Sequence, residues 1–323
     1  MTLVDRSHWQ ESLPWIDRPD ADIERRLAGL GSSLSPALRR NLIAWRERGI
    51  VIFEQAVAPD LIDRFVADLA HLKDHHRDYE LSVELAGKTK PIQDYRREEL
   101  DSNRIKFNHM HTISGPACRL SLNREVCEFL TQVFDDAPCV LQSLTFIRGS
   151  QQPIHIDYPY VCAQTKLAHL AASWVALEDV DPRAGPLAYY PGSHVNGIAG
   201  FFDWGQGSIL LRSDSARTPM EFAHHLWDRM QEAGIRPEIF CPRKGDVLIW
   251  HGALAHEGLP IKSPGLTRKS YVTHYTSLAG YPPGHMKPDA LKTGAYYVEN
   301  GGYIFDLPWL SNPRRLPSWD ERR

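Results

Sequence analysis

Two residues in the stretch 151–160 could bind a metal ion together: His155 and Asp157, which are two positions apart. The stretch reads as extended backbone, and in a strand residues i and i+2 point to the same face. An imidazole and a carboxylate on one face, completed by a third ligand from elsewhere, form the kind of site that holds non-haem Fe(II) and leaves coordination positions open. The pattern alone is weak evidence, because a chain with 15 histidines and 40 acidic residues contains His-x-Asp by chance.

A second stretch, 244–256, offers the third ligand and strengthens this interpretation. It contains a Gly-Asp pair, a short apolar run and two histidines, His251 and His256, and Arg268 follows it. Because the two histidines are five residues apart, they would lie on opposite faces of a regular strand. We therefore do not expect both to bind one metal ion.

The composition is that of an ordinary globular protein, with 42% hydrophobic and 24% charged residues in a chain of 323. The net charge of −3 gives no basic surface of the kind that nucleic-acid binding requires, so we expect no nucleic-acid partner. No signal peptide and no apolar segment of about 18 residues is visible, which predicts a cytoplasmic protein without a membrane partner.

Five cysteines are present, an odd number, and they form no C-x-x-C pair. This argues against a disulfide framework or a thiolate zinc site and fits a reducing compartment. The cysteines are Cys118, Cys127, Cys139, Cys162 and Cys241.

Short β-rich segments divided by turns dominate the chain from residue 141 to about residue 277. Such an array predicts a sandwich or barrel and not a parallel βαβ sheet. The fold class that we expect is mainly β with flanking helices. The expected strands are 141–148, 154–160, 167–177, 187–190, 239–241, 247–250 and 269–276.

Helix signals flank and interrupt these strands. Residues 36–48 have apolar side chains at helical spacing and end at Gly49, and another helix begins at Pro59. Thr218-Pro-Met-Glu221 is a capping box with proline at the first helical position, which predicts a helix that Gly234 ends.

We interpret residues 1–323 as a single catalytic domain. Residues 1–33 form a polar N-terminal lead-in, residues 34–277 form the core, and residues 278–323 form a C-terminal extension that packs across the core or against a second subunit. A helical insertion at about 195–237 interrupts the core and is a candidate substrate cover. The charged segment 73–104 is interpreted as a solvated face or a mobile loop.

Several motifs occur in a fixed order, and with them the sequence resembles the phytanoyl-CoA dioxygenase family from about residue 38 to residue 275. The resemblance implies a double-stranded β-helix (jelly-roll) core and an oxygenase that depends on Fe(II) and uses 2-oxoglutarate and O₂ as cosubstrates. The motifs are His155-Ile-Asp157, Trp174-Val-Ala-Leu-Glu-Asp179, Gly185-Pro-Leu187, Pro191-Gly-Ser-His194, Gly245-Asp246, His256 and Arg268.

By this resemblance His155 and Asp157 bind iron, and the third ligand is a histidine that follows Gly-Asp and an apolar strand. The family places this ligand at the later histidine, just before a turn containing Gly or Ser, which favours His256 and leaves His251 as a packed or supporting histidine. The resemblance also implies that Arg268 binds the distal carboxylate of 2-oxoglutarate. A planar guanidinium meets a carboxylate with two parallel hydrogen bonds, which lysine cannot reproduce.

Two further residues match family positions near the cosubstrate, Trp174 and, less closely, Lys106. Trp174 is equally well interpreted as an ordinary core aromatic residue. The chain departs from the family pattern at Gly258, where many relatives have a hydroxyl residue that helps to hold the distal carboxylate. Another donor must then assist Arg268, or the cosubstrate is held more loosely. His194 lies in a turn motif and need not contact the metal.

The activity that the resemblance implies is hydroxylation of a C–H bond of a small organic molecule, with succinate and CO₂ as co-products. Two alternatives stay open: a non-catalytic metal-binding jelly-roll protein, and a cupin-like zinc enzyme that uses the same ligand types. Six aromatic residues suggest an aromatic mouth: Tyr158, Tyr160, Tyr189, Phe201, Phe202 and Trp204. Three arginines near the insertion, Arg212, Arg217 and Arg236, suggest an anion. Core packing and solvated charge explain both features equally well, and we make no prediction of the oligomeric state.

Overall fold

The computed structural model describes residues 4–30, 35–161, 165–195, 201–310 and 314–322. Cys162 and parts of the segments 1–33, 195–237 and 278–323 lie outside the described residues. The cysteines within the described ranges are free thiols: Cys118, Cys127, Cys139 and Cys241.

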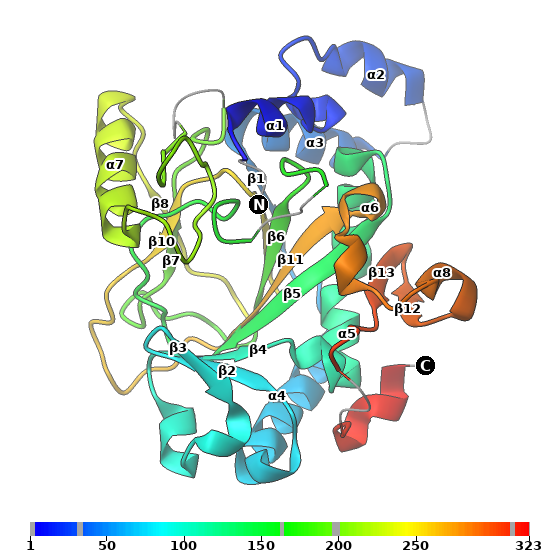
Figure 1. Cartoon of the computed structure of the whole chain (residues 1–323), viewed down its shortest axis with the longest axis vertical. Coiled ribbons are helices and arrows are strands. Elements are labelled where there is room, and N and C mark those ends of the chain that lie inside the picture. The colour runs from blue at the N-terminus through cyan, green and yellow to red at the C-terminus, as the bar shows by residue number, and fades with distance from the viewer. Residues whose placement is uncertain (1–3, 31–34, 162–164, 196–200, 311–313, 323) are drawn as a thin grey trace.

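Two sheets enclose the centre of the molecule (Figure 1). The larger sheet has the spatial order β1 (Ile50–Phe53), β9 (Val247–His251), β6 (Ala171–Ala176), β11 (Ser270–Ser277), β5 (Pro138–Phe146), β4 (Ile105–Asn108), β2 (Ser82–Leu85) and β3 (Lys88–Pro91). The smaller sheet has the order β10 (His256–Gly258), β7 (Leu187–Tyr189) and β8 (Glu238–Phe240). A single antiparallel bridge joins His155 to the edge of the smaller sheet at His256.

The chain crosses between these sheets in the order of a jelly roll. From β5 it passes to the His155 bridge in the smaller sheet, then to β6 in the larger sheet, to β7 and β8 in the smaller, to β9 in the larger, to β10 in the smaller and to β11 in the larger. The strand pairs of this core are antiparallel. The predicted fold, mainly β with flanking helices around a jelly-roll core, is confirmed.

Helices cover the outer face of the larger sheet, with α3 to α6 forming most of this layer (Figure 1). No helix in the described part of the chain combines the length and apolarity that a membrane crossing needs. The helices are α1 (Arg6–Glu11), α2 (Ile23–Leu30), α3 (Pro36–Arg48), α4 (Pro59–Asp74), α5 (Gly115–Ser121), α6 (Arg124–Phe134), α7 (Pro219–Glu232) and α8 (Ala290–Thr293).

The predicted helix ends follow from their capping residues. Ser35 accepts the N–H of Leu38 at the start of α3, and Gly49 ends this helix in the left-handed conformation, with φ of 72°. At α7, Thr218 and Glu221 cap each other reciprocally. Local signals alone therefore account for both boundaries.

The helical layer fixes which side chains of β11 face the barrel interior. The hydroxyls of Tyr271 and Ser121 lie 2.7 Å apart, and the Tyr275 hydroxyl donates to the Ser121 carbonyl oxygen at 2.6 Å, so the odd-numbered residues face α5. Strand side chains alternate, so Val272 and His274 point the other way, and both line the central cavity.

The segment 154–160, expected as a strand, forms only the bridge at His155. The N–H groups of Asp157 and Tyr158 both donate to the carbonyl oxygen of Gly252, at 2.9 and 3.1 Å, which turns the chain out of the ladder. Pro153 and Pro159 on either side have no N–H to continue it. The expectation of a regular strand here was wrong, although His155 is paired as in a strand.

Two segments interpreted as surface material are more ordered than expected. Within 73–104, β2 and β3 form a hairpin that extends the larger sheet, and the side chains of β3 are exposed and include two lysines, which hides the strand pattern. In the lead-in, Trp9, Ile16 and Leu27 are buried in the cores of the molecule. Isolated apolar residues in polar sequence gave no periodic signal for this packing.

The described part of the C-terminal extension packs on the barrel. Its strands β12 (Tyr296–Glu299) and β13 (Gly302–Phe305) form an antiparallel hairpin. Tyr303 of β13 pairs in parallel with Cys139 at the start of β5. This contact agrees with the expectation that the extension lies across the core.

Candidate functional site

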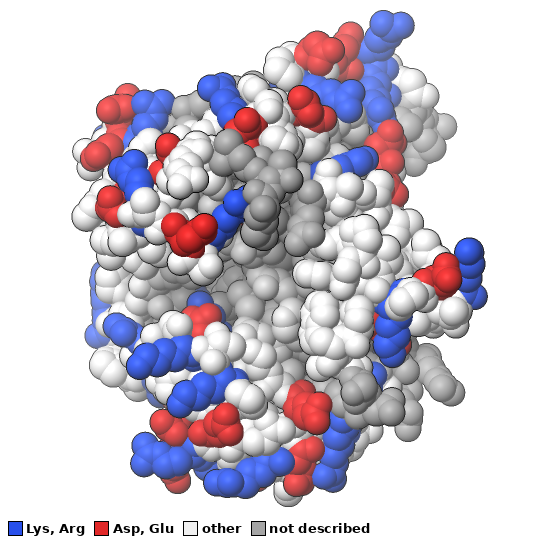
Figure 2. All heavy atoms as spheres, viewed as in Figure 1, with Lys and Arg blue, Asp and Glu red and all other residues white. Residues whose placement is uncertain are grey.

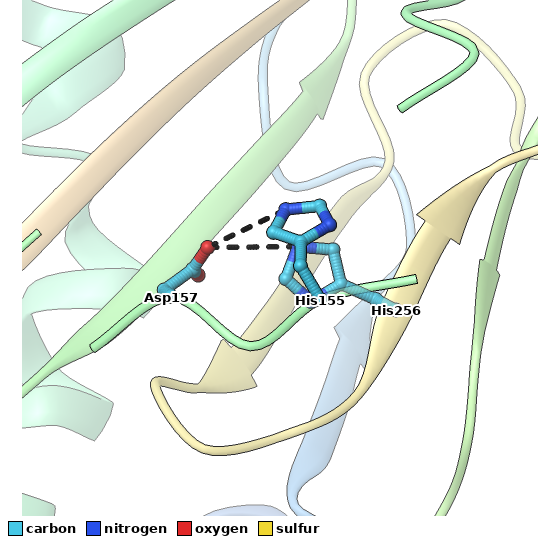
Figure 3. Close-up of side chains that lie close together, drawn as sticks. All are labelled: His155, Asp157 and His256. Carbon is cyan, nitrogen blue, oxygen red and sulfur yellow. Dashed lines mark ion pairs between the residues drawn. The ribbon is translucent and has the colours of Figure 1, made fainter. Parts of the chain in front are cut away.

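Backbone hydrogen bonds place two of the predicted ligands opposite each other. The N–H of His155 donates to the carbonyl oxygen of His256, and the N–H of His256 donates to that of His155, both at 2.9 Å. Residues that exchange both bonds are directly opposed in an antiparallel pair, and the two imidazole centroids are 4.2 Å apart. The turn at Asp157 brings its carboxylate to face both rings (Figure 3).

The polar atoms of these three side chains converge. Oδ1 of Asp157 lies 3.9 Å from Nε2 of His155 and 3.6 Å from Nε2 of His256. The Nδ1 atom of each histidine lies 2.9 Å from a backbone carbonyl oxygen, that of Pro153 or of Leu254. A ring whose Nδ1–H donates to a carbonyl presents a free lone pair on Nε2, which is the form that binds a metal ion. The group can therefore hold a metal ion through two Nε2 atoms and one carboxylate oxygen.

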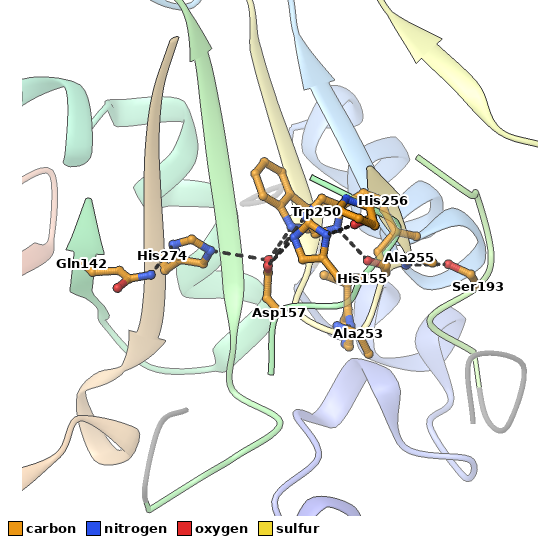
Figure 4. Close-up of polar contacts among 12 residues, drawn as sticks. Gln142, His155, Asp157, Ser193, Trp250, Ala253, Ala255, His256 and His274 are labelled. Carbon is orange, nitrogen blue, oxygen red and sulfur yellow. Dashed lines mark hydrogen bonds and ion pairs between the residues drawn. The ribbon is translucent and has the colours of Figure 1, made fainter. Parts of the chain in front are cut away.

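The other carboxylate oxygen of Asp157 is held by the larger sheet (Figure 4). The indole N–H of Trp250 donates to Oδ2 at 2.7 Å, and Nε2 of His274 lies 3.5 Å from Oδ2. Burial acts to raise the pKa of Asp157, but His256 and His274 outweigh it, and the pKa lies below its usual range. The carboxylate is thus ionised, with Oδ1 facing the histidines.

His155 is neutral at physiological pH. Burial, reinforced by the neighbouring His256, lowers its pKa to about 3. A neutral imidazole keeps the Nε2 lone pair available, so no proton has to be removed before a metal ion binds.

These side chains form one wall of a cavity of about 310 Å³. Figure 2 shows the molecule hollowed near the centre of this face, with acidic and basic side chains gathered below the hollow, over the β2–β3 hairpin and α4. Along β11 the cavity is lined by Arg268 just before the strand, then by Val272 and His274. Arg268 therefore marks one end of the cavity and His274 the other.

Arg268 is buried, with only 2% of its surface exposed. Its Nη1 donates to the carbonyl oxygen of Gly185 at 3.2 Å, and its Nε is buried with no hydrogen-bond partner among the described residues. The guanidinium carbon lies 5.5 Å from the ring centroid of Trp174 and 6.0 Å from that of Phe146. Burial lowers the pKa of Arg268 to about 10, so it stays charged at neutral pH. A buried charge in this state is unfavourable unless an anion binds it.

Trp174 and Lys106 line the same cavity, but their situations differ. Trp174 flanks the guanidinium of Arg268, as described above. The ammonium of Lys106 on β4 lies 2.9 Å from Oε1 of Glu84 on β2. The charge of Lys106 is therefore already balanced within the protein.

The geometry explains the glycine at position 258. A Cβ at Gly258 would collide with the hydroxyl of Ser150 and would lie 2.9 Å from the backbone nitrogen of Gln151. Ser150 lines the cavity, and its hydroxyl accepts the N–H of Gln152 at 3.3 Å, which leaves its own proton free to be donated. A hydroxyl from another segment thus occupies the space that a side chain at 258 would fill.

Ser270 is a buried hydroxyl residue that sequence reasoning did not single out. It follows Arg268 by two positions, so strand alternation puts the two residues on the same face. Its hydroxyl is fully buried and has no partner among the described residues.

His251 lies apart from the three converging side chains. Its Nε2 is 3.2 Å from Oδ2 of Asp17, and its Nδ1 accepts the N–H of Ala253 at 2.9 Å. The ring also packs near His194, at 5.1 Å between centroids. Because β9 and β10 belong to different sheets, the separation of His251 from His256 arises from a turn between sheets and not from the two faces of one strand.

Sequence reasoning also missed Trp250 and His274, the two partners of Asp157. For His274 a sequence signal was available: side chains alternate along the predicted strand 269–276, which puts residues 270, 272 and 274 on one face. The aromatic residues expected at the mouth divide into two groups: Tyr160 lines the cavity, whereas Tyr158 packs on Trp9 at 4.4 Å between centroids.

A family model described as "Phytanoyl-CoA dioxygenase (PhyH)" matches residues 45–270, which is more than half of the chain. The chain belongs to the phytanoyl-CoA dioxygenase family. Within this family, the "phytanoyl-CoA dioxygenase domain-containing protein 1" of Mus musculus and that of Rattus norvegicus are each 26% identical to the chain over 162 residues, covering 46% of this chain and 49% of the relative. The chain spans about half the length of the curated relatives it matches.

Solved structures of iron- and 2-oxoglutarate-dependent enzymes share the fold of this family member. The epimerase SnoN, in complex with Fe³⁺, alpha ketoglutarate and nogalamycin RO, matches with a TM-score of 0.52 and 17% identity, covering 87% of this chain and 94% of that one. EctD from S. alaskensis, with 2-oxoglutarate and 5-hydroxyectoine, matches with a TM-score of 0.51 and 15% identity, covering 86% and 84%. At these identities the likeness concerns the fold.

Proposed function

We propose that this member of the phytanoyl-CoA dioxygenase family is an Fe(II)- and 2-oxoglutarate-dependent dioxygenase that hydroxylates a C–H bond of a small organic molecule. Succinate and CO₂ are the co-products. The observation that carries the proposal is a single cavity with the His155, Asp157 and His256 group on one wall and the buried charge of Arg268 at one end. The shared fold of SnoN and EctD, both solved with 2-oxoglutarate or alpha ketoglutarate, supports it.

The Arg268 end of the cavity fits the distal carboxylate of 2-oxoglutarate. A carboxylate would pair with the buried guanidinium and accept from the Nε that has no partner among the described residues. Ser150, which lines the cavity, would contribute a hydroxyl donor in place of the side chain that Gly258 lacks. Trp174 supplies an apolar wall that excludes water and strengthens the ion pair.

The metal-binding group fits Fe(II), which when bound would supply O₂ activation and oxidative decarboxylation of the cosubstrate. The chain's own residues provide the rest. His155 and His256 keep their Nε2 lone pairs free through hydrogen bonds from Nδ1 to backbone carbonyl oxygens. Trp250 holds one oxygen of Asp157 and so leaves the other directed at the metal position.

A cosubstrate assay tests this function directly. Protein supplied with Fe(II), ascorbate and O₂ should convert 2-oxoglutarate slowly into succinate even without a substrate. In Arg268→Ala the KM for 2-oxoglutarate should rise by more than about 30-fold, since losing a buried charge-assisted contact costs about 2–5 kcal/mol. Arg236→Ala, a change at an exposed arginine, is the matched control and should behave as the wild type.

The rival functions give different results in the same assay. A non-catalytic metal-binding protein or a zinc enzyme needs no cosubstrate anchor, so it would show neither succinate formation nor calorimetric binding of 2-oxoglutarate at millimolar concentration with Mn(II) in place of iron. That result would reject the proposed function. Once a substrate is found, turnover under ¹⁸O₂ should add one labelled oxygen to the product, whereas a desaturated or cyclised product without label would reject hydroxylation.

A further inference from the structure

The part of the cavity opposite Arg268 is lined by polar side chains from neighbouring strands. Gln142 of β5 and His274 of β11 are cross-strand partners, and Nε2 of Gln142 lies 3.3 Å from Nδ1 of His274 (Figure 4). Beside them, Asn108 of β4 pairs with Leu144 of β5, so it too stands over this part of the sheet. These side chains present amide and imidazole groups, which donate and accept hydrogen bonds.

His109, which directly follows β4, adds a strained position to the same wall. Its φ is 60°, in the left-handed region that non-glycine residues seldom adopt. Its Nδ1 is buried with no partner among the described residues, although the residue lines the cavity. Strained backbone of this kind clusters at ligand-binding sites. Burial, together with His285, lowers the pKa of His109 to about 4, so the ring is neutral.

Among the described residues, this part of the cavity has no lysine or arginine side chain that lacks an acidic partner. Two lysine or arginine side chains are among the described residues that line the whole cavity. Lys106 pairs with Glu84, and Arg268 lies at the other end. The arginines of the insertion that suggested an anion (Arg212, Arg217 and Arg236) do not line it. A phosphate or carboxylate group placed near Gln142 would therefore lose its hydration without gaining a countercharge.

An aromatic side chain that is partly exposed to solvent also lines the cavity. Tyr160 lines the cavity, with its ring 6.0 Å from that of His155 and 5.9 Å from that of Trp204 in the insertion. Burial, with a smaller effect of Asp157, raises the pKa of Tyr160 to about 12, so its hydroxyl stays protonated. A ring face in the same cavity as these polar groups suits a molecule that carries both C–H groups and hydroxyl groups.

We infer that the part of the primary substrate that enters this cavity is uncharged and carries hydroxyl or amide groups, which hydrogen-bond to Gln142 and His109. An acyl chain would leave these polar groups unpaired, and a phosphorylated compound would bury an unpaired charge. The inference rests on the proposed function, because that function assigns the Arg268 end of the cavity to the cosubstrate.

Matched neutral and anionic probes test the inference. The full chain is loaded with Zn(II) and 2-oxoglutarate, and saturation-transfer NMR compares methyl α-glucoside with glucose 6-phosphate, glycerol with glycerol 3-phosphate, and both with hexanoyl-CoA. We expect saturation transfer to the neutral probes and none to the anionic ones. In Gln142→Leu, which keeps the size of the side chain and removes its hydrogen bonds, affinity for the neutral probes should fall roughly fivefold to tenfold. Gln231→Leu, at an exposed position on α7, is the control and should bind as the wild type.

Three results would overturn the inference: no binding of either neutral probe, preference for an anionic probe or for the CoA ester, or equal neutral binding in Gln142→Leu and the wild type. Failure of the proposed function looks different. In that case 2-oxoglutarate itself would not bind, which calorimetry on the same sample detects before any probe is added.

Discussion

At the scale of single residues, the two carboxylate oxygens of Asp157 have different contacts and different roles. Oδ1 faces the two Nε2 atoms of the metal-binding group, whereas Oδ2 is held by Trp250 and approached by His274. A carboxylate fixed in this way loses little freedom when a metal ion binds. Supporting partners of this kind commonly change metal affinity when they are removed.

Trp250→Phe should therefore weaken metal binding without unfolding the protein. The substitution removes the indole N–H that donates to Asp157 and keeps an aromatic ring in a buried position. We expect affinity for Mn(II), measured by calorimetry, to fall about 10-fold to 100-fold. Trp309→Phe, at an exposed site, is the control, and unchanged affinity in Trp250→Phe would show that the hydrogen bond does not support the ligand.

His256→Ala and His251→Ala should have opposite effects. His256→Ala removes one of three converging ligand atoms, so bound iron per chain, measured in anaerobically prepared protein, should be lost while the fold survives. His251→Ala should retain iron but lower the free energy of unfolding by about 1–3 kcal/mol, because the contact with Asp17 and the bond from the Ala253 N–H disappear. Full iron in His256→Ala and none in His251→Ala would reverse the assignment.

At the scale of elements, tight contact between β10 and the loop at 150–152 constrains the sheet edge that carries His256. Gly258→Ser should lower the free energy of unfolding by about 1–3 kcal/mol, because its side chain must displace both a hydroxyl and backbone nitrogen atoms. Gly265→Ser, where a Cβ would meet no atom within 4 Å, should be nearly neutral. Urea unfolding of both variants measures the difference, and equal stabilities would contradict this account of position 258.

Element types were predictable from the sequence wherever local signals agree, and less so where tertiary contacts decide. The ends of α7 follow from Thr218, Pro219 and Glu221, so a single sequence sufficed. The strand expected at 154–160 failed because the carbonyl of Gly252, distant in sequence, accepts two N–H groups that a strand would pair elsewhere. Alternation along the predicted strand indicates which face His274 is on, but its nearness to Asp157 arises only when β11 closes the barrel.

At the scale of the whole molecule, neutral buried histidines make stability depend on pH. Burial lowers the pKa values of His109, His169 and His194 from 6.5 to about 4, 4 and 3. Between these values and 6.5 the unfolded chain binds more protons than the folded one, so stability is present above about pH 6.5 and is lost as pH falls. Each histidine contributes up to about 1.4 kcal/mol per pH unit to this loss.

Urea unfolding at pH 7, 6 and 5 measures this slope. His169→Gln removes one of the three groups at a site remote from the cavity. The change in its free energy of unfolding with pH should therefore be smaller than that of the wild type, by up to about 1.4 kcal/mol per pH unit. A stability that stays constant between pH 7 and pH 5 would show that these histidines are protonated in the folded protein.

Because the guanidinium of Arg268 is buried, the stability of the folded chain should depend on whether an anionic ligand is bound to it. A ligand that binds only the folded form and pairs with this charge stabilises it by about 2.7 kcal/mol at one hundred times its dissociation constant. We expect 2-oxoglutarate, added to protein already loaded with Mn(II), to raise the melting temperature of the wild type and to leave that of Arg268→Ala nearly unchanged. Proteases in the cell degrade the unfolded fraction of a protein. The lifetime of this protein should therefore increase with the concentration of 2-oxoglutarate. A cell depleted of 2-oxoglutarate would lose the protein itself as well as its activity.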